Sequence, residues 1–162
     1  MAGHDASGVA KRLLEKAHER GQPLTPMQLI KLVYIAHGWM LGLYSRPLIN
    51  EPVEAWRYGP VVRSVYDQVK CYRSSPVEAI AAKPAELNDY EDDLLDQVLE
   101  IYGDKSGLLL STITHQSGTP WFITWHSQGM NGSISNDLIE AHFEELYRRH
   151  KEEAEDQAGS DG

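Results

Sequence analysis

Histidine and glutamate side chains at metal-ligand spacing are the first candidates for chemistry in this 162-residue sequence. The seven histidines include no pair four residues apart, the spacing at which one helix face presents both rings to a zinc ion. A single Glu-x-x-His run, from Glu15 to His18, would place two ligands on one helix. A di-iron helical bundle needs a second copy of that run, which the sequence lacks. We therefore expect no metal and no other cofactor.

Nucleophilic catalysis finds equally little support in the sequence. Cys71, the single cysteine, has no Cys-x-x-Cys partner and no protease-like signature around it. No Gly-x-Ser-x-Gly nucleophile elbow occurs. We therefore expect no catalytic residues and a protein that is not an enzyme. The enzyme alternative would require a deep pocket in which His37, His115 and Arg57 converge.

Charge is unevenly distributed along the chain, whose net charge of −9 argues against nucleic acid as a partner. Residues 86–104 contain eight acidic and no basic residues, whereas residues 57–73 combine basic and tyrosine side chains. Opposite charges in one small domain predict oriented docking of a protein partner. Two simpler interpretations are solvated helix faces, or arginines that balance the acidic helix or the partner. The candidate partner-binding residues are Arg57, Tyr58, Arg63, Asp92, Asp93 and Asp96.

The elements that must position these residues are mainly helices. Residues 25–44 begin with a Thr-Pro-x-Gln start signal and carry apolar residues on nearly every side, which is typical of a central buried helix. Gly38 and Gly42 within it favour close packing of helices over a phosphate cradle. Further helices are expected at about 7–19, 60–71, 89–102, 105–115 and 120–128, and from 135 onward.

Residues 47–58 interrupt the helical pattern. Two prolines and the β-prone Val53, Trp56 and Tyr58 predict a short β-hairpin, which Gly59-Pro60 would end. Residues 129–132 are expected to form a loop. The predicted fold is mostly α (α+β): a compact multi-helix domain around the central helix, with a short hairpin near 47–58.

The predicted domain organisation is simple. Residues 1–150 should form one helical domain, and residues 151–162 a disordered acidic tail without apolar residues large enough to pack. The N-terminal residues lack the apolar run of a signal peptide, and no stretch is long enough to cross a membrane. One cysteine cannot form an internal disulfide, so we expect a cytoplasmic protein with no membrane partner.

A longer pattern runs from Leu24 to Tyr66. It contains Leu-x-Lys-Leu-x-Tyr, then Gly-Trp, then Pro-Leu and Glu-Ala-Trp-x-Tyr-Gly-Pro-Val, and a Thr-His and a Pro-Trp follow later. About residues 20–127 resemble the SocA-like antitoxin domain, or Panacea domain, often labelled a phage-associated protein. The signature residues, expected to be mostly structural, are Lys31, Tyr34, Trp39, Glu54, Trp56, Tyr58, Gly59, Pro60, His115, Pro120 and Trp121.

The resemblance implies a bacterial or prophage antitoxin that neutralises a toxin, encoded by an adjacent gene, through direct binding. One type of relative acts as an adaptor that delivers its toxin to a ClpXP-type protease, which is the first alternative. A prophage-encoded regulatory or interaction protein without a toxin partner is another. Many relatives carry an added DNA-binding domain for autoregulation; we expect no room for one here. Within the signature, Gly59-Pro60 should set a turn, with Trp56 and Tyr58 packed beneath it.

Overall fold

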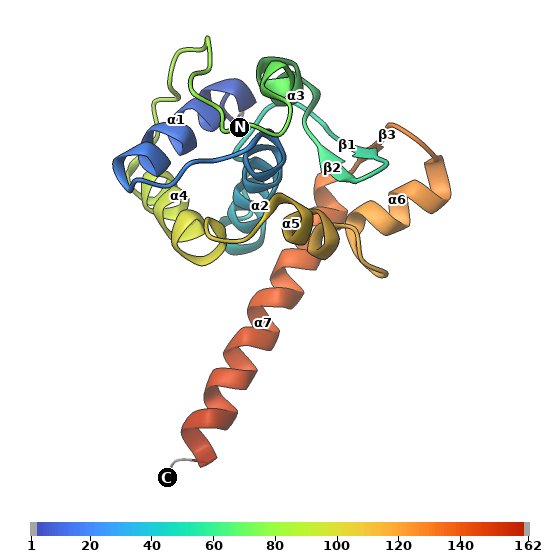
Figure 1. The fold of residues 1–162 in the computed structure, drawn as a ribbon. Helices are drawn as coiled ribbons and strands as arrows, with labels where there is room; N and C mark the ends of the chain where they lie inside the picture. The colour runs from blue at the N-terminus through green and yellow to red at the C-terminus, as the bar shows by residue number, and fades with distance from the viewer. Residues whose placement is uncertain (1–2, 161–162) are drawn as a thin grey trace.

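The fold is an assembly of helices around α2 with a small sheet at one side, as a computed structural model of residues 3–160 shows (Figure 1). This confirms the mostly helical fold with a short β-hairpin. The elements are α1 (Ala6–Glu19), α2 (Pro26–Tyr44), β1 (Val53–Trp56), β2 (Gly59–Val61), α3 (Arg63–Val69), a 3-10 helix (Lys70–Tyr72), α4 (Asp89–Tyr102), α5 (Gly107–Thr114), α6 (Pro120–Gln128), β3 (Gly132–Ile134) and α7 (Asn136–Ser160).

Helix α2 is the centre of the fold, as its sequence predicts. The Thr25 side chain accepts a hydrogen bond from the Gln28 N–H, and the Gln28 side chain accepts one from the Thr25 N–H at 2.9 Å. This capping box satisfies two backbone donors at the start of the helix. Helices α1, α4, α5 and α7 all pack against α2. Its apolar residues are therefore buried on nearly every side.

The first half of α7 packs closely against α2. A Cβ atom added at Gly38 would lie 2.1 Å from the Phe143 ring, and one at Gly42 would lie 2.7 Å from the Phe143 Cβ. The Phe143 ring also meets the Trp39 ring edge to face, at 5.1 Å between centroids. The two glycines thus permit close helix packing, as their helical setting predicts.

The sheet has the strand order β2-β1-β3, with both pairs antiparallel. Trp56 lies opposite Gly59, so Arg57 and Tyr58 form a two-residue turn. The hairpin therefore lies further along the chain than the predicted residues 47–58. Gly59-Pro60 belongs to β2 and neither ends the hairpin nor begins α3. Proline is tolerated there because β2 is an edge strand. Residues 132–134, within or beside the expected loop, form β3 through long-range pairing with β1.

The second half of α7 projects from the body of the molecule (Figure 1). The expected disordered tail begins at residue 151, but the structure continues the helix to Ser160. Glutamate, alanine and glutamine favour helix, and nothing interrupts the run before Gly159. Residues 151–159 are all exposed. Residues 161–162 lie outside the described residues, and the division into domain and tail remains a prediction.

Across residues 3–160, no helix is both long and apolar enough to span a bilayer.

Candidate protein-binding site

The β1–β2 hairpin is fixed to the central helix by a buried lysine. The Lys31 side chain is fully buried, and its Nζ donates a hydrogen bond to the Pro60 carbonyl oxygen at 2.9 Å. Burial lowers the pKa of this ammonium group to about 7. Gly59 has a φ of 119°, and a Cβ atom there would lie 3.1 Å from Lys31 Nζ. The Gly-Pro pair therefore lets the hairpin approach the lysine.

Helices α5 and α6 hold the turn of the hairpin from the other side. Trp121 Nε1 donates to the Trp56 carbonyl oxygen at 2.6 Å, and the Ser111 hydroxyl donates to the Tyr58 carbonyl oxygen. The Trp121 ring stacks on the Trp125 ring and meets the His115 ring edge to face. The carbonyl groups of Trp56 and Tyr58, on either side of Arg57, are thus bound by side chains, which fixes the position of the turn.

The outer side of β1 carries a small network around Glu54. The Glu54 carboxylate accepts hydrogen bonds from Trp56 Nε1 at 3.0 Å and from the Arg63 guanidinium at 3.0 and 3.3 Å. The Arg63 hydrogen bond is the main reason that the pKa of Glu54 lies below its ordinary value. Arg63 also stacks over the Trp56 ring, 5.1 Å from its centroid. This candidate residue therefore already has a partner within the chain.

A groove lies beside the hairpin and combines apolar walls with positive charge. Its volume is about 470 Å³. Tyr58 is 58% exposed at the turn, so the expectation that it packs beneath the turn is wrong; its carbonyl, not its ring, faces α5. We call this feature the hairpin groove; its lining residues are Pro26, Met27, Ile30, Lys31, Trp56, Arg57, Tyr58, Val61, Tyr66, Lys70 and Arg73.

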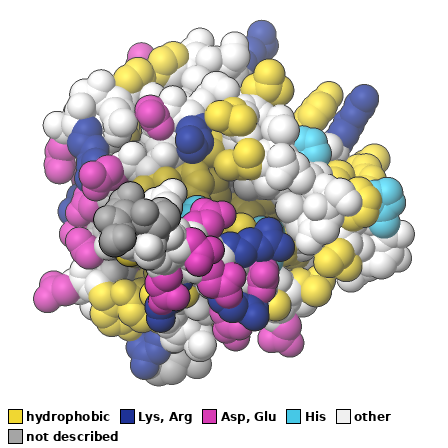
Figure 2. Space-filling view, turned by 90° about the horizontal axis from the view of Figure 1, so that it is seen from below, with side chains coloured by type: hydrophobic (Ala, Val, Ile, Leu, Met, Phe, Trp, Pro, Cys, Tyr) yellow, Lys and Arg dark blue, Asp and Glu magenta, His cyan; other side chains and the backbone are white. Residues whose placement is uncertain are grey.

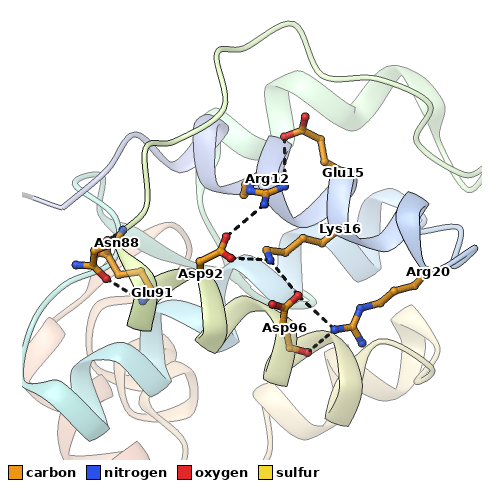
Figure 3. A network of polar contacts seen from close by, with 8 residues as sticks. All are labelled: Arg12, Glu15, Lys16, Arg20, Asn88, Glu91, Asp92 and Asp96. Carbon is orange, nitrogen blue, oxygen red and sulfur yellow. Dashed lines mark hydrogen bonds and ion pairs between the residues drawn. The ribbon is translucent and has the colours of Figure 1, made fainter.

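The acidic face of α4 is paired with α1 (Figure 3). Asp92 contacts Arg12 at 3.4 Å and Lys16 at 3.1 Å. Asp96 contacts Lys16 at 3.0 Å and Arg20 at 3.3 Å. Burial alone would raise the pKa of Asp96, but its hydrogen bonds and charge interactions with Lys16 and Arg20 bring it below the ordinary value. Basic residues within α1 and at its C-terminal cap thus balance this face, not the arginines of residues 57–73.

Asp93 lies apart from this ion-pair network. It is exposed, and its carboxylate accepts a hydrogen bond from the Gln97 side chain at 3.0 Å. The six predicted partner-binding residues therefore fall on two surfaces. Arg57 and Tyr58 line the hairpin groove, with Arg63 on the neighbouring outer side of β1, whereas the three aspartates lie on α4. The sequence signal for the pairing of α4 with these basic residues is the spacing of Arg12, Lys16 and Arg20, four residues apart on one helix face.

The residues of the enzyme alternative are held in separate surroundings. His37 Nδ1 accepts the Leu48 N–H at 3.2 Å, so its Nε2 is assigned as the donor to the Asn136 side chain at 3.0 Å. Burial lowers the pKa of His37, which favours this neutral form. His115 packs on Trp121, and the hairpin groove is lined by Arg57 but by neither histidine.

A second hollow lies beside α7, on the face seen from below in Figure 2. Acidic and basic side chains gather together on this face, next to hydrophobic ones. The hollow has a volume of about 360 Å³, and its lining includes Glu145 and Arg149, which form an ion pair at 3.2 Å. Because its charges are matched within the chain, this hollow differs from the hairpin groove, whose lining includes no carboxylate.

Comparison with known proteins places these features in a family. Residues 29–122 match the family model described as Antitoxin SocA-like, Panacea domain. The chain belongs to this family. It is 29% identical over 163 residues to Antitoxin SocA of Caulobacter vibrioides (strain NA1000 / CB15N), across 91% of this chain and 84% of that protein. No solved structure matches the chain.

The matched part of the Panacea domain extends from α2 to the start of α6. It contains the hairpin, the lysine that holds it and most of the groove beside it. Membership of this family supports an antitoxin role and implies a toxin partner in general. It gives no support to an enzymatic function.

Proposed function

We propose that this chain is an antitoxin that neutralises a cognate toxin by binding it directly, and that the hairpin groove is the centre of the binding surface. The observation that carries the proposal is the presentation of Arg57 and Tyr58 on a turn whose backbone is held from α2, α5 and α6. Tyrosine and arginine are the residue types that most often dominate the energy of protein interfaces. The family supplies the kind of partner, a toxin.

The rigidity of this turn favours tight binding. Every side chain or loop that becomes ordered on association makes the free energy of binding less favourable. Here Trp121 and Ser111 already bind the carbonyl groups of Trp56 and Tyr58, so little further ordering of the backbone is needed. The exposed Tyr58 ring can then contribute apolar contact area together with a hydroxyl group.

The α4 surface is the secondary candidate. Asp92 and Asp96 are engaged with Arg12, Lys16 and Arg20. Of the three predicted aspartates, Asp93 therefore remains without an ion pair among the described residues. We therefore assign the main contact to the hairpin groove and a peripheral one to Asp93.

Coexpression with the product of the adjacent gene tests this proposal. The neighbouring protein alone should arrest growth, and coexpression of this chain should restore growth and yield a complex that copurifies. Tyr58→Ala should weaken the complex by about tenfold or more, as a central interface aromatic does. Tyr147→Ala is the control, because Tyr147 is 49% exposed but lies on α7. Equal effects of the two variants would refute the hairpin groove as the binding site. If the adjacent gene product is harmless and forms no complex with this chain, the antitoxin role is refuted.

A proteolytic adaptor is the second candidate function. The projecting half of α7 favours it, because an adaptor that holds a toxin also needs a separate surface for a ClpXP-type protease (Figure 1). Sequestration predicts that the toxin accumulates in an inactive complex. The adaptor mechanism predicts that the toxin disappears when the protease is present and accumulates when it is deleted. Immunoblotting of the toxin in both backgrounds separates the two mechanisms.

A further inference from the structure

We infer that the hairpin groove receives an acidic segment of the toxin, with one aromatic or large aliphatic side chain on the apolar floor and neighbouring carboxylates against the basic rim. This inference rests on the proposed function and specifies the chemistry of the partner. Four features of the groove lead to it: its floor, its rim, the buried lysine and the surrounding charge.

The floor of the groove is apolar and large enough for a side chain. Ile30 and Val61 are buried, whereas Met27, Trp56 and Tyr66 are partly exposed. The Trp56 and Tyr66 rings pack edge to face, at 4.9 Å between centroids. A volume of about 470 Å³ is in the usual range for sites that hold a compact apolar group. An aromatic or large aliphatic side chain of the toxin would cover this floor.

The rim of the groove is basic. Arg57, Lys70 and Arg73 are exposed and line it. Lys70 contacts Asp67 at 3.3 Å, a pair in which both side chains are more than half exposed and which therefore contributes little. Among residues 3–160, neither Arg57 nor Arg73 forms an ion pair with a carboxylate. These cations can accept carboxylates from a partner without breaking a strong internal pair.

The lining of the groove also includes a hydrogen-bond donor, Lys31, that does not use all of its N–H groups. The Lys31 ammonium group has three N–H donors, and the described residues supply one acceptor, the Pro60 carbonyl oxygen. An ammonium group buried without a carboxylate is poorly stabilised, and the lowered pKa of Lys31 agrees with this. Because the Lys31 side chain is fully buried, its charge would act on a bound carboxylate through the floor of the groove, while the basic rim would contact that carboxylate directly. The groove thus favours an anion beside its apolar contact.

The net charge of −9 does not prevent an acidic segment from binding at this basic patch. Acidic proteins repel one another at long range, but exposed charges farther apart than about 10 Å are screened at ordinary salt concentration. A toxin segment that reaches the groove therefore meets the local cations of the rim more strongly than the distant acidic residues. Toxin segments that are basic or fully polar would leave these cations or the floor unmatched.

The test is direct binding of the purified toxin to the intact chain over a range of salt concentrations. The double variant Arg57→Glu/Arg73→Glu should weaken binding by about tenfold or more and should flatten its salt dependence. Arg57→Lys/Arg73→Lys should retain most of the affinity. Lys151→Glu is the matched control, because Lys151 is an exposed cation on α7 and should have no effect. Thermal unfolding of each variant checks that these exposed substitutions leave the fold intact.

Overlapping peptides from the toxin identify the segment. The expected binder carries a carboxylate beside an aromatic or large aliphatic residue, and it should compete with the whole toxin. Unchanged affinity of the Glu variant, or a basic peptide as the binder, would overturn this inference while leaving the antitoxin role intact. Binding of a DNA duplex that the Glu variant abolishes would instead assign the groove to nucleic acid. If the wild-type chain neither binds nor neutralises the toxin, the proposed function itself fails.

Discussion

The Nζ atom of Lys31 and the carbonyl oxygen of Pro60 lie 2.9 Å apart and join the central helix α2 to the edge strand β2. This contact links two parts of the family signature that are 29 residues apart in the chain. Because Lys31 also lies beneath the hairpin groove, one buried residue supports both the hairpin and the floor of the candidate binding surface. Changes here should therefore affect stability as well as binding.

The stability of the protein should depend on pH through Lys31. Its pKa is about 7 in the folded state and about 10.4 in an unfolded chain, so the unfolded state binds more protons between these values. The free energy of unfolding should therefore rise from pH 7 to pH 9.5, by at most a few kcal/mol from this group. Lys31→Met should lack this rise. Urea denaturation of both proteins at the two pH values measures it, and parallel pH profiles would contradict the assignment.

Substitution of Gly59 should destabilise the hairpin more than backbone strain alone can explain. Gly59→Ala places a Cβ atom 3.1 Å from Lys31 Nζ at a φ of 119°. We expect a loss of about 1–3 kcal/mol. Gly118→Ala is the control, since Gly118 also has a positive φ, 85°, but no atom lies within 4 Å of the added Cβ. Similar losses for both variants in chemical denaturation would show that the lysine contact is unimportant.

The aspartates of α4 should separate into structural and surface groups. Asp92→Lys places a positive charge beside Arg12 and Lys16, so it should destabilise the protein by about 1–2 kcal/mol. Asp93→Lys should change stability by less than about 0.5 kcal/mol. Thermal unfolding distinguishes them, and equal losses would contradict the separation. Asp93→Lys is therefore the suitable variant for testing whether α4 contacts the toxin.

The projecting end of α7 should be dispensable for folding. Deletion of residues 152–162 removes side chains that are exposed throughout residues 152–159, so the unfolding temperature should change little. By contrast, Phe143→Ala should cost about 3–5 kcal/mol, because this ring fills the space beside Gly38 and Trp39. A large loss on truncation would show that the tail contacts the body of the protein.

The sequence predicted the elements whose signals are local. The capping box at Thr25 and the continuous apolar surface of residues 26–44 specified the position and burial of α2. The alternating apolar and acidic faces of residues 89–102 did the same for α4. Helix ends and amphipathic faces arise from contacts within a few residues, so their patterns are visible in a single sequence.

The sheet and the pairing of charges were decided by tertiary structure. Strand β3 is defined by pairing with β1, about 80 residues earlier, and nothing within residues 132–134 specifies that partner. Likewise, the acidic face of α4 looked available for a partner until its contacts with α1 were known. Long-range pairing brings together residues whose separation in the chain carries no information about their distance in space. For this protein, the sequence determined the helices and the family signature, and the tertiary structure decided which charged residues remain available for binding.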